Sequence, residues 1–262
     1  PYSNDLIENH ELYLKRQDFS ECVDKAFEWA NQELIRIVVN EKKLVARLTS
    51  IKYYFFLQAG DFFIHFMDSA GSELAKEPVL ISQEKLQSLL EMSIRTSSAD
   101  SDPFKDDVYC YLAGFHFSQI LASYQGLAKK ELHKMEFMIG NESTAENRNK
   151  AAKGSKGHDY FTLGYNVEWP LNLILTETNL ILYKLVFKNF FALRFTEYEL
   201  YNCWSKTKDM KTEELPGYAK GFFLLLQRMI NFVRNVIYSF CIEVVEERWK
   251  TFLSNLQNVV EV

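Results

Sequence analysis

Hydrophobic residues recur every three or four positions along most of the sequence, which is the spacing of one face of an α-helix. In the first clear example the apolar positions are Val23, Phe27, Ala30, Leu34 and Ile37. Ser82 precedes another such stretch and is a residue type that caps helix N-termini. Helices are therefore expected at 20–40, 41–57, 61–77, 81–98 and 118–138.

Two longer helices are expected in the C-terminal third. The first has an apolar stripe on each of two sides, and a helix with that pattern packs against neighbours on both sides. Its stripes are Leu180, Tyr183, Phe187, Phe191, Phe195 and Tyr198 on one side, and Leu182, Val186, Phe190, Leu193, Leu200 and Trp204 on the other. The expected stripe of the last helix is Phe222, Leu226, Met229, Val233, Val236, Phe240 and Val244.

Four segments depart from the helical period. "VYCYLAGFHF" at 108–117 predicts either a short strand or an irregular turn, and "DYFTLGYNV" at 159–167 predicts a short strand or extended segment. Residues 140–158 are polar and rich in Asn, Gly, Ser and Lys, which is typical of an exposed, mobile loop. Residues 205–217 predict a polar connector between the two long helices.

The dipeptide Trp169-Pro170 lies between the extended segment and the first long helix. Proline is favoured at the first helical position, because its missing N–H would have no partner there anyway. It also keeps the preceding residue out of the α conformation. We therefore expect Pro170 to start the helix and Trp169 to bury its ring at the corner as a structural anchor.

The composition favours a folded, mostly helical protein. The 262 residues are 47 % hydrophobic and 15 % aromatic, and disordered chains lack such a content. The 10 Gly and 5 Pro are too few for the turns of an all-β protein of this length. The expected fold class is all-α: a large irregular helical bundle with a short extended segment and a mobile polar loop.

Charge, cysteines and hydrophobic runs argue against several classes of protein. The net charge of −5 disfavours nucleic-acid binding, which usually leaves a basic surface. The four cysteines form no Cys-x-x-Cys pair, which argues against a zinc site or a disulfide framework. No run of about 18 uncharged apolar residues is present, so no membrane span is expected. The chain begins with Pro1, and we interpret it as a piece of a longer protein.

No enzyme motif is complete. "KGSKG" at 153–157 lacks the spacing of a phosphate-binding loop, and a solvated loop is the favoured interpretation. "DDVYC" at 106–110 is similar to the first half of the magnesium-binding motif of all-α enzymes such as terpenoid synthases, but the final carboxylate is missing. A solvated turn is favoured for Asp106 and Asp107. We therefore assign no catalytic residue, cofactor site or metal ligand, and expect no enzyme activity.

Four basic residues follow one side of the second expected helix: Lys42, Lys43, Arg47 and Lys52. Steps of four and five place them loosely along the same side. Two interpretations stay open. The side is either a solvated face, which is the more common case, or a docking strip for an acidic partner.

Three ordered blocks of sequence resemble the signature of the gamma-tubulin complex proteins. They are "SIKYYFFLQAGDFFIHFMD" at 50–68, "VEWPLNLIL" at 167–175 with the long helix after it, and "LLLQRMINFVRNVIYSF" at 224–240. The segment "ADSDPFKDDV" at 99–108 is most similar to component two of that complex. Each block alone is weak, but the three in this order make the resemblance specific.

The resemblance implies a domain organisation and a function. Residues 1–19 would be a helical lead-in or linker, and 20–262 a partial C-terminal GRIP-type domain with its flexible loop at about 140–158. The implied function is a scaffold subunit that binds gamma-tubulin and templates microtubule nucleation. Implied partners are gamma-tubulin and other components of the complex, the latter mainly through an N-terminal domain absent from this chain. The implied location is the cytoplasm and cytoskeleton, at a microtubule-organising centre such as a centrosome or spindle pole body.

Site residues follow less directly from the resemblance. The signature side chains are expected to build the core: Trp169, Pro170, Leu171, Tyr183, Phe187, Trp204, Arg228 and Phe232. Expected contacts with gamma-tubulin are Lys206, Lys208, Arg234, Tyr165 and Asn166. A generic helical tethering or adaptor module remains the alternative, because composition does not separate the two.

Overall fold

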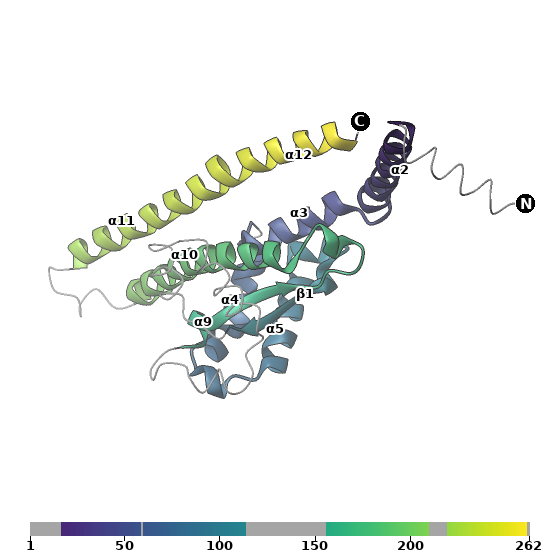
Figure 1. Ribbon diagram of the computed structural model, residues 1–262. Helices are drawn as coiled ribbons and strands as arrows, with labels where there is room; N and C mark the ends of the chain where they lie inside the picture. The colour runs from purple at the N-terminus through teal and green to yellow at the C-terminus, as the bar shows by residue number, and fades with distance from the viewer. Residues whose placement is uncertain (1–16, 59, 114–155, 210–218, 261–262) are drawn as a thin grey trace, which may run out of the picture.

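The computed structural model of the chain describes residues 17–58, 60–113, 156–209 and 219–260. The first half contains α2 (Gln17–Arg36), the short π-helix η1 (Ile37–Glu41), α3 (Leu44–Phe55), α4 (Gly60–Leu74), α5 (Gln83–Thr96) and β1 (Val108–Leu112). The second half contains α9 (Gly157–Tyr160), β2 (Phe161–Tyr165), α10 (Glu177–Asp209), α11 (Ala219–Tyr238), the π-helix η6 (Ser239–Glu246) and α12 (Glu247–Val260). The last three form one continuous rod above α10, and α2 projects away from the body (Figure 1).

The predicted all-α fold is confirmed, with a small sheet added. The two segments expected to be extended pair with each other, because β1 and β2 run antiparallel with Cys110 opposite Leu163. Gly164 lies opposite Tyr109, and a Cβ at residue 164 would lie 2.2 Å from the Tyr109 ring. The sheet packs between α5 and α10, so it belongs to the core of the domain.

The core is largely aromatic and joins α3, α4, β2 and α10. Phe187 on α10 is fully buried, and its ring centroid lies 6.0 Å from those of Phe55 on α3 and Phe161 on β2. Phe191, one turn further along α10, contacts Phe63 on α4 at 5.8 Å. The first expected stripe of α10 therefore faces this core.

The second stripe of α10 faces the rod. Phe190 contacts Phe240 of η6 with ring centroids 6.3 Å apart, and Trp204 contacts Phe223 of α11 at 5.3 Å. Leu182 is the exception, with 45 % of its surface exposed. Packing of α10 on two sides is thus confirmed.

The expected stripe of the last helix is partly wrong. Leu226 and Val233 of that stripe are buried as expected, but the other buried residues of the rod are Ile230, Ile237 and Cys241. Phe222, Met229, Phe240 and Val244, which were expected to face inward, are 41 %, 45 %, 48 % and 51 % exposed. The physical reason is that this helix carries apolar residues on several sides, so the pattern alone does not select the buried one.

The Trp169-Pro170 corner differs from its prediction. Pro170 is buried but precedes only a single 3₁₀ turn, Leu171–Leu173, and α10 begins later, at Glu177. The ring of Trp169 is 73 % exposed rather than buried. Leu171, at 1 % exposure, fills the core at this corner instead, so Trp169 is not the anchor.

The structure tests one predicted helix cap and the ends of the predicted loop and connector. The Ser82 cap is confirmed, since its Oγ accepts from the Lys85 backbone N–H at 3.4 Å. Gly157 is buried at the start of α9 and donates its N–H to the Lys76 carbonyl at 2.9 Å, so the last residues of the predicted loop are part of the fold. Residues 205–209 likewise continue α10. Segments 1–16, 114–155 and 210–218, which hold most of the predicted loop, the 118–138 helix and most of the connector, lie outside the described residues.

Candidate partner-binding surfaces

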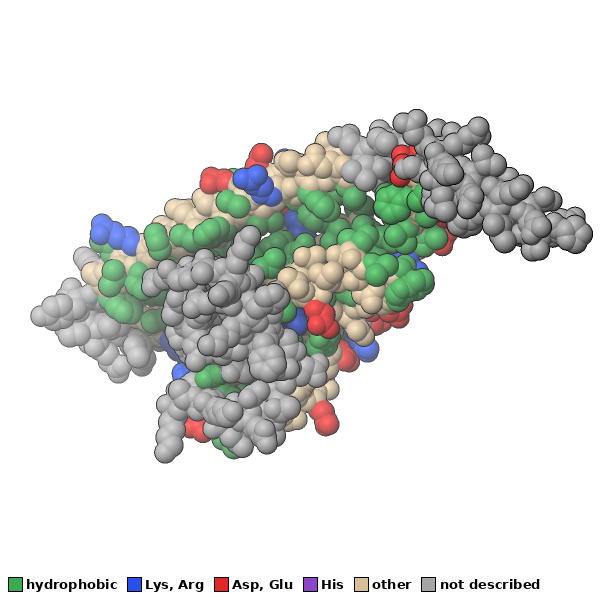
Figure 2. Space-filling model, viewed as in Figure 1, with side chains coloured by type: hydrophobic (Ala, Val, Ile, Leu, Met, Phe, Trp, Pro, Cys, Tyr) green, Lys and Arg blue, Asp and Glu red, His purple; other side chains and the backbone are tan. Residues whose placement is uncertain are grey.

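One side of α11 is both hydrophobic and exposed. Phe222, Leu225, Met229 and Phe232 follow each other at steps of three and four, and are 41 %, 57 %, 45 % and 69 % exposed. We call these four residues the α11 face. Hydrophobic side chains gather along the rod in Figure 2. An exposed apolar patch of this kind marks a protein-interaction site more often than the scattered single hydrophobic residues of an ordinary surface.

Two of the predicted contact residues lie close to the α11 face. Lys206 and Lys208 are exposed in the last turn of α10. That end of α10 meets the beginning of α11, because Trp204 packs edge-on against Phe223. The structure therefore brings two lysines to the end of the α11 face at which Phe222 lies.

Arg234, a third predicted contact, bridges α10 and α11. Its Nε donates to Oε1 of Glu197 at 3.3 Å, and its guanidinium lies 5.0 Å from the ring centroid of Tyr201. Arg194 donates to the other oxygen of Glu197 at 3.1 Å. Because the Arg234 side chain is 56 % exposed, it is accessible to a partner while it makes these contacts.

The other two predicted contacts do not join this group. Tyr165, at the end of β2, is only 3 % exposed, so its side chain is part of the core rather than the surface. Asn166 is exposed, and its backbone N–H donates to the Asp107 carbonyl at 2.8 Å. Asn166 precedes the N-terminal end of α10, whereas Lys206 lies near the other end of that helix, which is about 50 Å long. One surface patch does not contain both.

The signature residues divide between core and surface. Pro170, Leu171 and Phe187 are buried, and Tyr183 and Trp204 are half-buried, as expected. The expectation is wrong for Trp169, Arg228 and Phe232, which are all exposed. Phe232 belongs to the α11 face, and Arg228 lies one helical turn before it. These two signature residues therefore belong to the surface of α11 and do not pack in the core.

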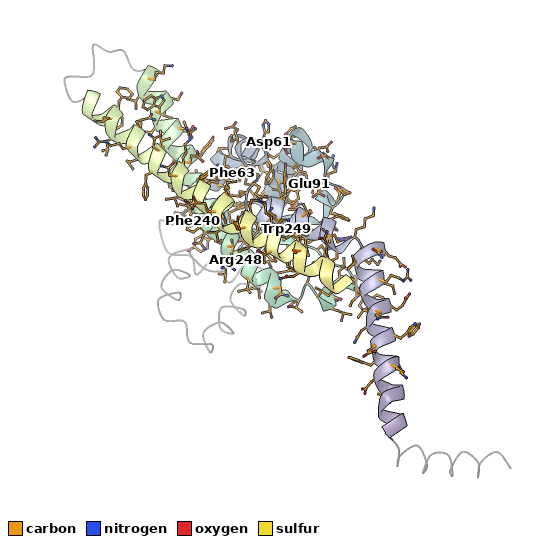
Figure 3. The ribbon with its side chains drawn as sticks, turned by 90° about the horizontal axis from the view of Figure 1, so that it is seen from above. Asp61, Phe63, Glu91, Phe240, Arg248 and Trp249 are labelled. Carbon is orange, nitrogen blue, oxygen red and sulfur yellow. The ribbon has the colours of Figure 1, made fainter. Side chains whose placement is uncertain are left out.

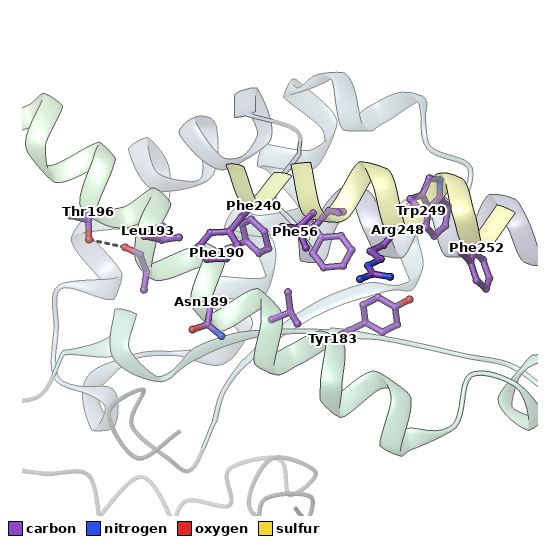
Figure 4. Close-up of a pocket in the computed structure, with 14 residues that line it drawn as sticks. Phe56, Tyr183, Asn189, Phe190, Leu193, Thr196, Phe240, Arg248, Trp249 and Phe252 are labelled. Carbon is purple, nitrogen blue, oxygen red and sulfur yellow. Dashed lines mark hydrogen bonds between the residues drawn. The ribbon is translucent and has the colours of Figure 1, made fainter. Parts of the chain in front are cut away.

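A large hollow lies between α10 and the rod. It has a volume of 900 Å³ and is lined mainly by aromatic and aliphatic side chains (Figure 4). We call it the aromatic groove; its lining is Phe56, Tyr183, Val186, Asn189, Phe190, Ala192, Leu193, Thr196, Phe240, Val244, Val245, Arg248, Trp249 and Phe252. Arg248 is the one charged residue among these, and Figure 3 shows it beside Trp249 on the rod.

The four basic residues between 42 and 52 do not form an exposed strip. Lys42 and Lys43 are exposed, but Arg47 pairs with Asp107 at 2.6 Å and Lys52 pairs with Glu246 at 2.6 Å. The side chains of Arg47 and Lys52 are only 14 % and 8 % exposed. The docking-strip interpretation is therefore wrong for these two, which hold the fold together.

The acidic pair at 106–107 is not arranged like a metal site. Asp107 is committed to Arg47, and burial raises the pKa of its carboxyl while Arg47 opposes that shift. Within the described ranges, no group of three or more His, Cys, Asp or Glu side chains is placed to hold a metal ion.

Among the residues that the structure describes, the most deeply buried charged group is Lys188 on α10. It is 3 % exposed and donates from Nζ to the Asp159 carbonyl at 2.9 Å. Burial lowers the pKa of Lys188 to about 7, and the nearby Asp159 only partly offsets the effect. The group lies beside His158, which stacks on Phe195 with ring centroids 4.4 Å apart.

Comparison with known proteins decides the family. Residues 44–262 match the family model for the gamma tubulin complex component C-terminal region. This is most of the chain. The chain belongs to the gamma-tubulin complex component family. The match spans α3 to the end of the rod, so the α11 face and the aromatic groove both lie within the family region.

Individual relatives agree with this family. The chain is 34 % identical over 251 residues to gamma-tubulin complex component 2 of Mus musculus, and 31 % identical over 252 residues to that of Arabidopsis thaliana. It is 30 % identical over 274 residues to the spindle pole body component alp4 of Schizosaccharomyces pombe. These matches cover 95 %, 96 % and 92 % of this chain, but only 27 %, 35 % and 35 % of the relatives. The chain thus spans about a third of their length or less.

The α11 face is the feature that sequence reasoning missed. Its signal was present, because Phe222, Leu225, Met229 and Phe232 have helical spacing. The buried residues Leu226, Ile230 and Val233 have the same spacing. The helix therefore has two apolar sides, and only its packing shows which side is covered.

In the part of the chain that the structure describes, no helix is long and apolar enough to span a membrane.

Proposed function

We propose that this chain is part of a scaffold subunit of the gamma-tubulin complex, that it binds gamma-tubulin, and that it helps to template microtubule nucleation. The observation that supports this proposal most directly is the α11 face. It is a hydrophobic, exposed stripe on the rod, within the region that matches the family model. The names of the relatives, gamma-tubulin complex component 2 and a spindle pole body component, support the choice of partner.

The proposed contact surface has a hydrophobic centre and a basic edge. The α11 face supplies the centre, and Arg228, Lys206 and Lys208 supply exposed positive charge toward its edges, whereas Arg234 adds a charge on the side of α11 that meets α10. Interfaces of proteins are built in this way, with apolar anchors surrounded by a polar rim. The charges would set the orientation and the rate of association more than the affinity.

A scaffold promotes nucleation by lowering the entropy cost of association. Several subunits must meet at once to start a filament, and each loses translational and rotational freedom when it does so. A protein that holds gamma-tubulin molecules at fixed positions removes part of that cost, because the later contacts become intramolecular. The two-sided packing of α10 supports this role, since it makes the rod that carries the α11 face rigid with the core.

The remaining parts of the proposal concern location and partners. We propose that the whole protein acts in the cytoplasm at a microtubule-organising centre, and that other complex components bind mainly through parts outside this chain. We propose no catalytic role, and the paired Asp107 gives no support for magnesium chemistry. The net charge of −5 gives none for a nucleic-acid partner.

A pull-down of purified gamma-tubulin by the 262-residue chain tests the proposal. Retention at micromolar concentration supports it. A chain that is folded by circular dichroism and yet retains no gamma-tubulin at that concentration argues for the alternative, a generic helical tethering or adaptor module. The α11 face would then belong to a different protein partner.

A further inference from the structure

The helix α2 leaves the body of the domain with an exposed hydrophobic side. Val23, Phe27 and Leu34 are 50 %, 66 % and 41 % exposed, and Ala30 is exposed between them. Their steps of four, three and four place all four residues on one side of the helix. We call them the α2 stripe. Figures 1 and 3 both show α2 projecting away from the rest of the domain.

The direction of α2 is fixed at its C-terminal end. Arg36 has α-helical dihedral angles, with φ −56° and ψ −48°, so α2 continues without a break into η1. Val38 of η1 is 1 % exposed and belongs to the hydrophobic core. Folding α2 back onto its own domain would therefore break a continuous helix or pull Val38 out of the core. The α2 stripe needs an occupant from another molecule.

The aromatic groove has the length that such a stripe requires. Its lining runs from Tyr183 to Thr196 along α10 and from Phe240 to Phe252 along the rod (Figure 4). At 1.5 Å per residue the α10 side is about 20 Å long, and the α2 stripe is about 17 Å long. Phe240 and Phe252 are still 48 % and 41 % exposed. A groove between two helices commonly binds the apolar side of a third helix.

The charges of the two surfaces are complementary. At 100° per residue, Asp24 and Glu33 lie on the two flanks of the α2 stripe. Lys25 and Arg36 lie on the opposite side, where Arg36 donates to Glu33 at 3.1 Å. Arg248 is the one charged residue that lines the groove, and within the described residues its guanidinium makes no hydrogen bond or ion pair. An acidic apolar helix therefore suits this groove in charge as well as in length.

Neither surface suits a copy of itself. Two α2 stripes packed together would bring the carboxylates of their flanks close to each other, and like charges disfavour such a pair. Two grooves are both hollow, and each would present Arg248 to the other. Each chain carries one stripe and one groove, however, so two copies can exchange helices in both directions. Reciprocal exchange doubles the contact area and closes the assembly with two-fold symmetry.

We propose that the aromatic groove binds α2 of a second copy of this chain, and that two copies form a dimer by exchanging these helices. The α2 stripe then lies in the groove, and Arg248 faces the acidic flank of the helix. This inference goes beyond the binding of gamma-tubulin and does not depend on it. The groove begins on the rod at Phe240, after Phe232, the last residue of the α11 face.

The test places one charge in each of the two surfaces of the full chain. Phe27→Asp changes the α2 stripe, and Val244→Asp changes the groove at a residue that is 51 % exposed. Met92→Asp is the control, because it places the same charge on α5 at a side chain that is 60 % exposed. Circular dichroism first shows that all three variants are folded. Sedimentation equilibrium across the micromolar range then gives the dissociation constant of the dimer for each protein.

The wild type and Met92→Asp should form dimers of equal stability. The dissociation constant should be at least about tenfold weaker for Phe27→Asp and for Val244→Asp, as for the loss of a central apolar contact. An equimolar mixture of these two variants should contain more dimer than either alone. The reason is that one unchanged α2 then meets one unchanged groove.

Four results would overturn the proposal. A wild type that stays monomeric would mean that another protein, or another segment of a longer one, covers the groove. A dimer weakened only by Phe27→Asp would pair α2 with α2, and one weakened only by Val244→Asp would pair groove with groove. A dimer that neither substitution weakens would use a different surface.

Discussion

Arg234 on α11 donates from Nε to Oε1 of Glu197 on α10 at 3.3 Å, and its guanidinium covers the ring of Tyr201. The carboxylate is shared, because Arg194 donates to its other oxygen. An ion pair this exposed contributes at most about 1 kcal/mol to stability. The ion pair of Arg234 therefore adds little to the stability of the α10–α11 contact. Its exposed guanidinium remains available for contact with a partner.

Alanine substitutions at the basic edge should separate binding from stability. We expect Lys206→Ala, Lys208→Ala and Arg234→Ala each to weaken gamma-tubulin binding, because each removes an exposed positive charge from the end of α10 or from α11. The Tm should fall by less than about 3 °C, the equivalent of 1 kcal/mol for a domain of this size. Thermal unfolding by circular dichroism and a binding titration check this. A larger fall in Tm at any of the three would mark that residue as structural.

Truncation of Phe232 should change the stability of the chain little, whereas truncation of its neighbour Val233 should lower it clearly. Phe232 is 69 % exposed, so Phe232→Ala should change the free energy of unfolding by no more than about 0.5 kcal/mol. Val233 is 9 % exposed against α10, so Val233→Ala should cost about 1–2 kcal/mol through lost burial and a small cavity. Urea unfolding of the two variants measures both. Equal costs would show that the α11 face is covered in solution.

Buried Lys188 should make stability depend on pH above neutrality. Its pKa of about 7 in the folded chain lies below that of an unfolded lysine, about 10.5, so between these values the unfolded chain binds the extra proton. Stability should therefore rise with pH across this window and level off below pH 7. From pH 7 to pH 9 the wild type should gain about 2 kcal/mol relative to Lys188→Met, which has no proton to bind. Urea unfolding of both proteins at the two pH values gives the difference, and parallel curves would contradict the buried position.

Gly164 should not tolerate a side chain. An alanine Cβ there would lie 2.2 Å from the ring of Tyr109 across the sheet, so Gly164→Ala should destabilise by about 1–3 kcal/mol. Gly71 is the matched control, because only the end of Met67 lies near its Cβ position, at 4.0 Å. Gly71→Ala in the interior of α4 should be neutral or stabilising by up to about 1 kcal/mol. Similar unfolding midpoints for the two variants would argue against the close ring contact.

The parts of the fold that the sequence predicts well are those in which pattern and packing agree. The two stripes of α10 face two different neighbours, as their spacing requires, and Ser82 caps α5. The β1–β2 pairing is less predictable, because two short extended segments about 50 residues apart do not reveal their register. The exposed Trp169 was mispredicted for a related reason: Leu171, two residues on, fills the same corner, and local sequence does not show which side chain the core selects.

The candidate surface was only partly predictable. Lys206, Lys208 and Arg234 follow from the resemblance; the structure places the two lysines at the end of α10 that meets the start of α11, and Arg234 further along α11. Tyr165 fails because β2 is buried on both faces, so alternation along the strand gives no solvent side. The π-helical η6 has a sequence signal in the steps of four from Val233 to Trp249, but local sequence does not show that Glu246 at its end pairs with Lys52, almost 200 residues away. Contacts of that range are set by the tertiary fold and not by local propensity.

The central claim is that the α11 face binds gamma-tubulin, and a titration with a matched pair of variants tests it most directly. Phe232→Asp places a charge on the α11 face, whereas Met92→Asp places the same charge on α5 at a methionine that is 60 % exposed. Kd for purified gamma-tubulin is measured for the wild-type chain and both variants, after circular dichroism shows that all three are folded. The account predicts a Kd at least about tenfold weaker for Phe232→Asp, as for the loss of a central apolar anchor, and a wild-type Kd for Met92→Asp. Equal affinities for all three proteins, or no binding by the wild type at micromolar concentration, would contradict it.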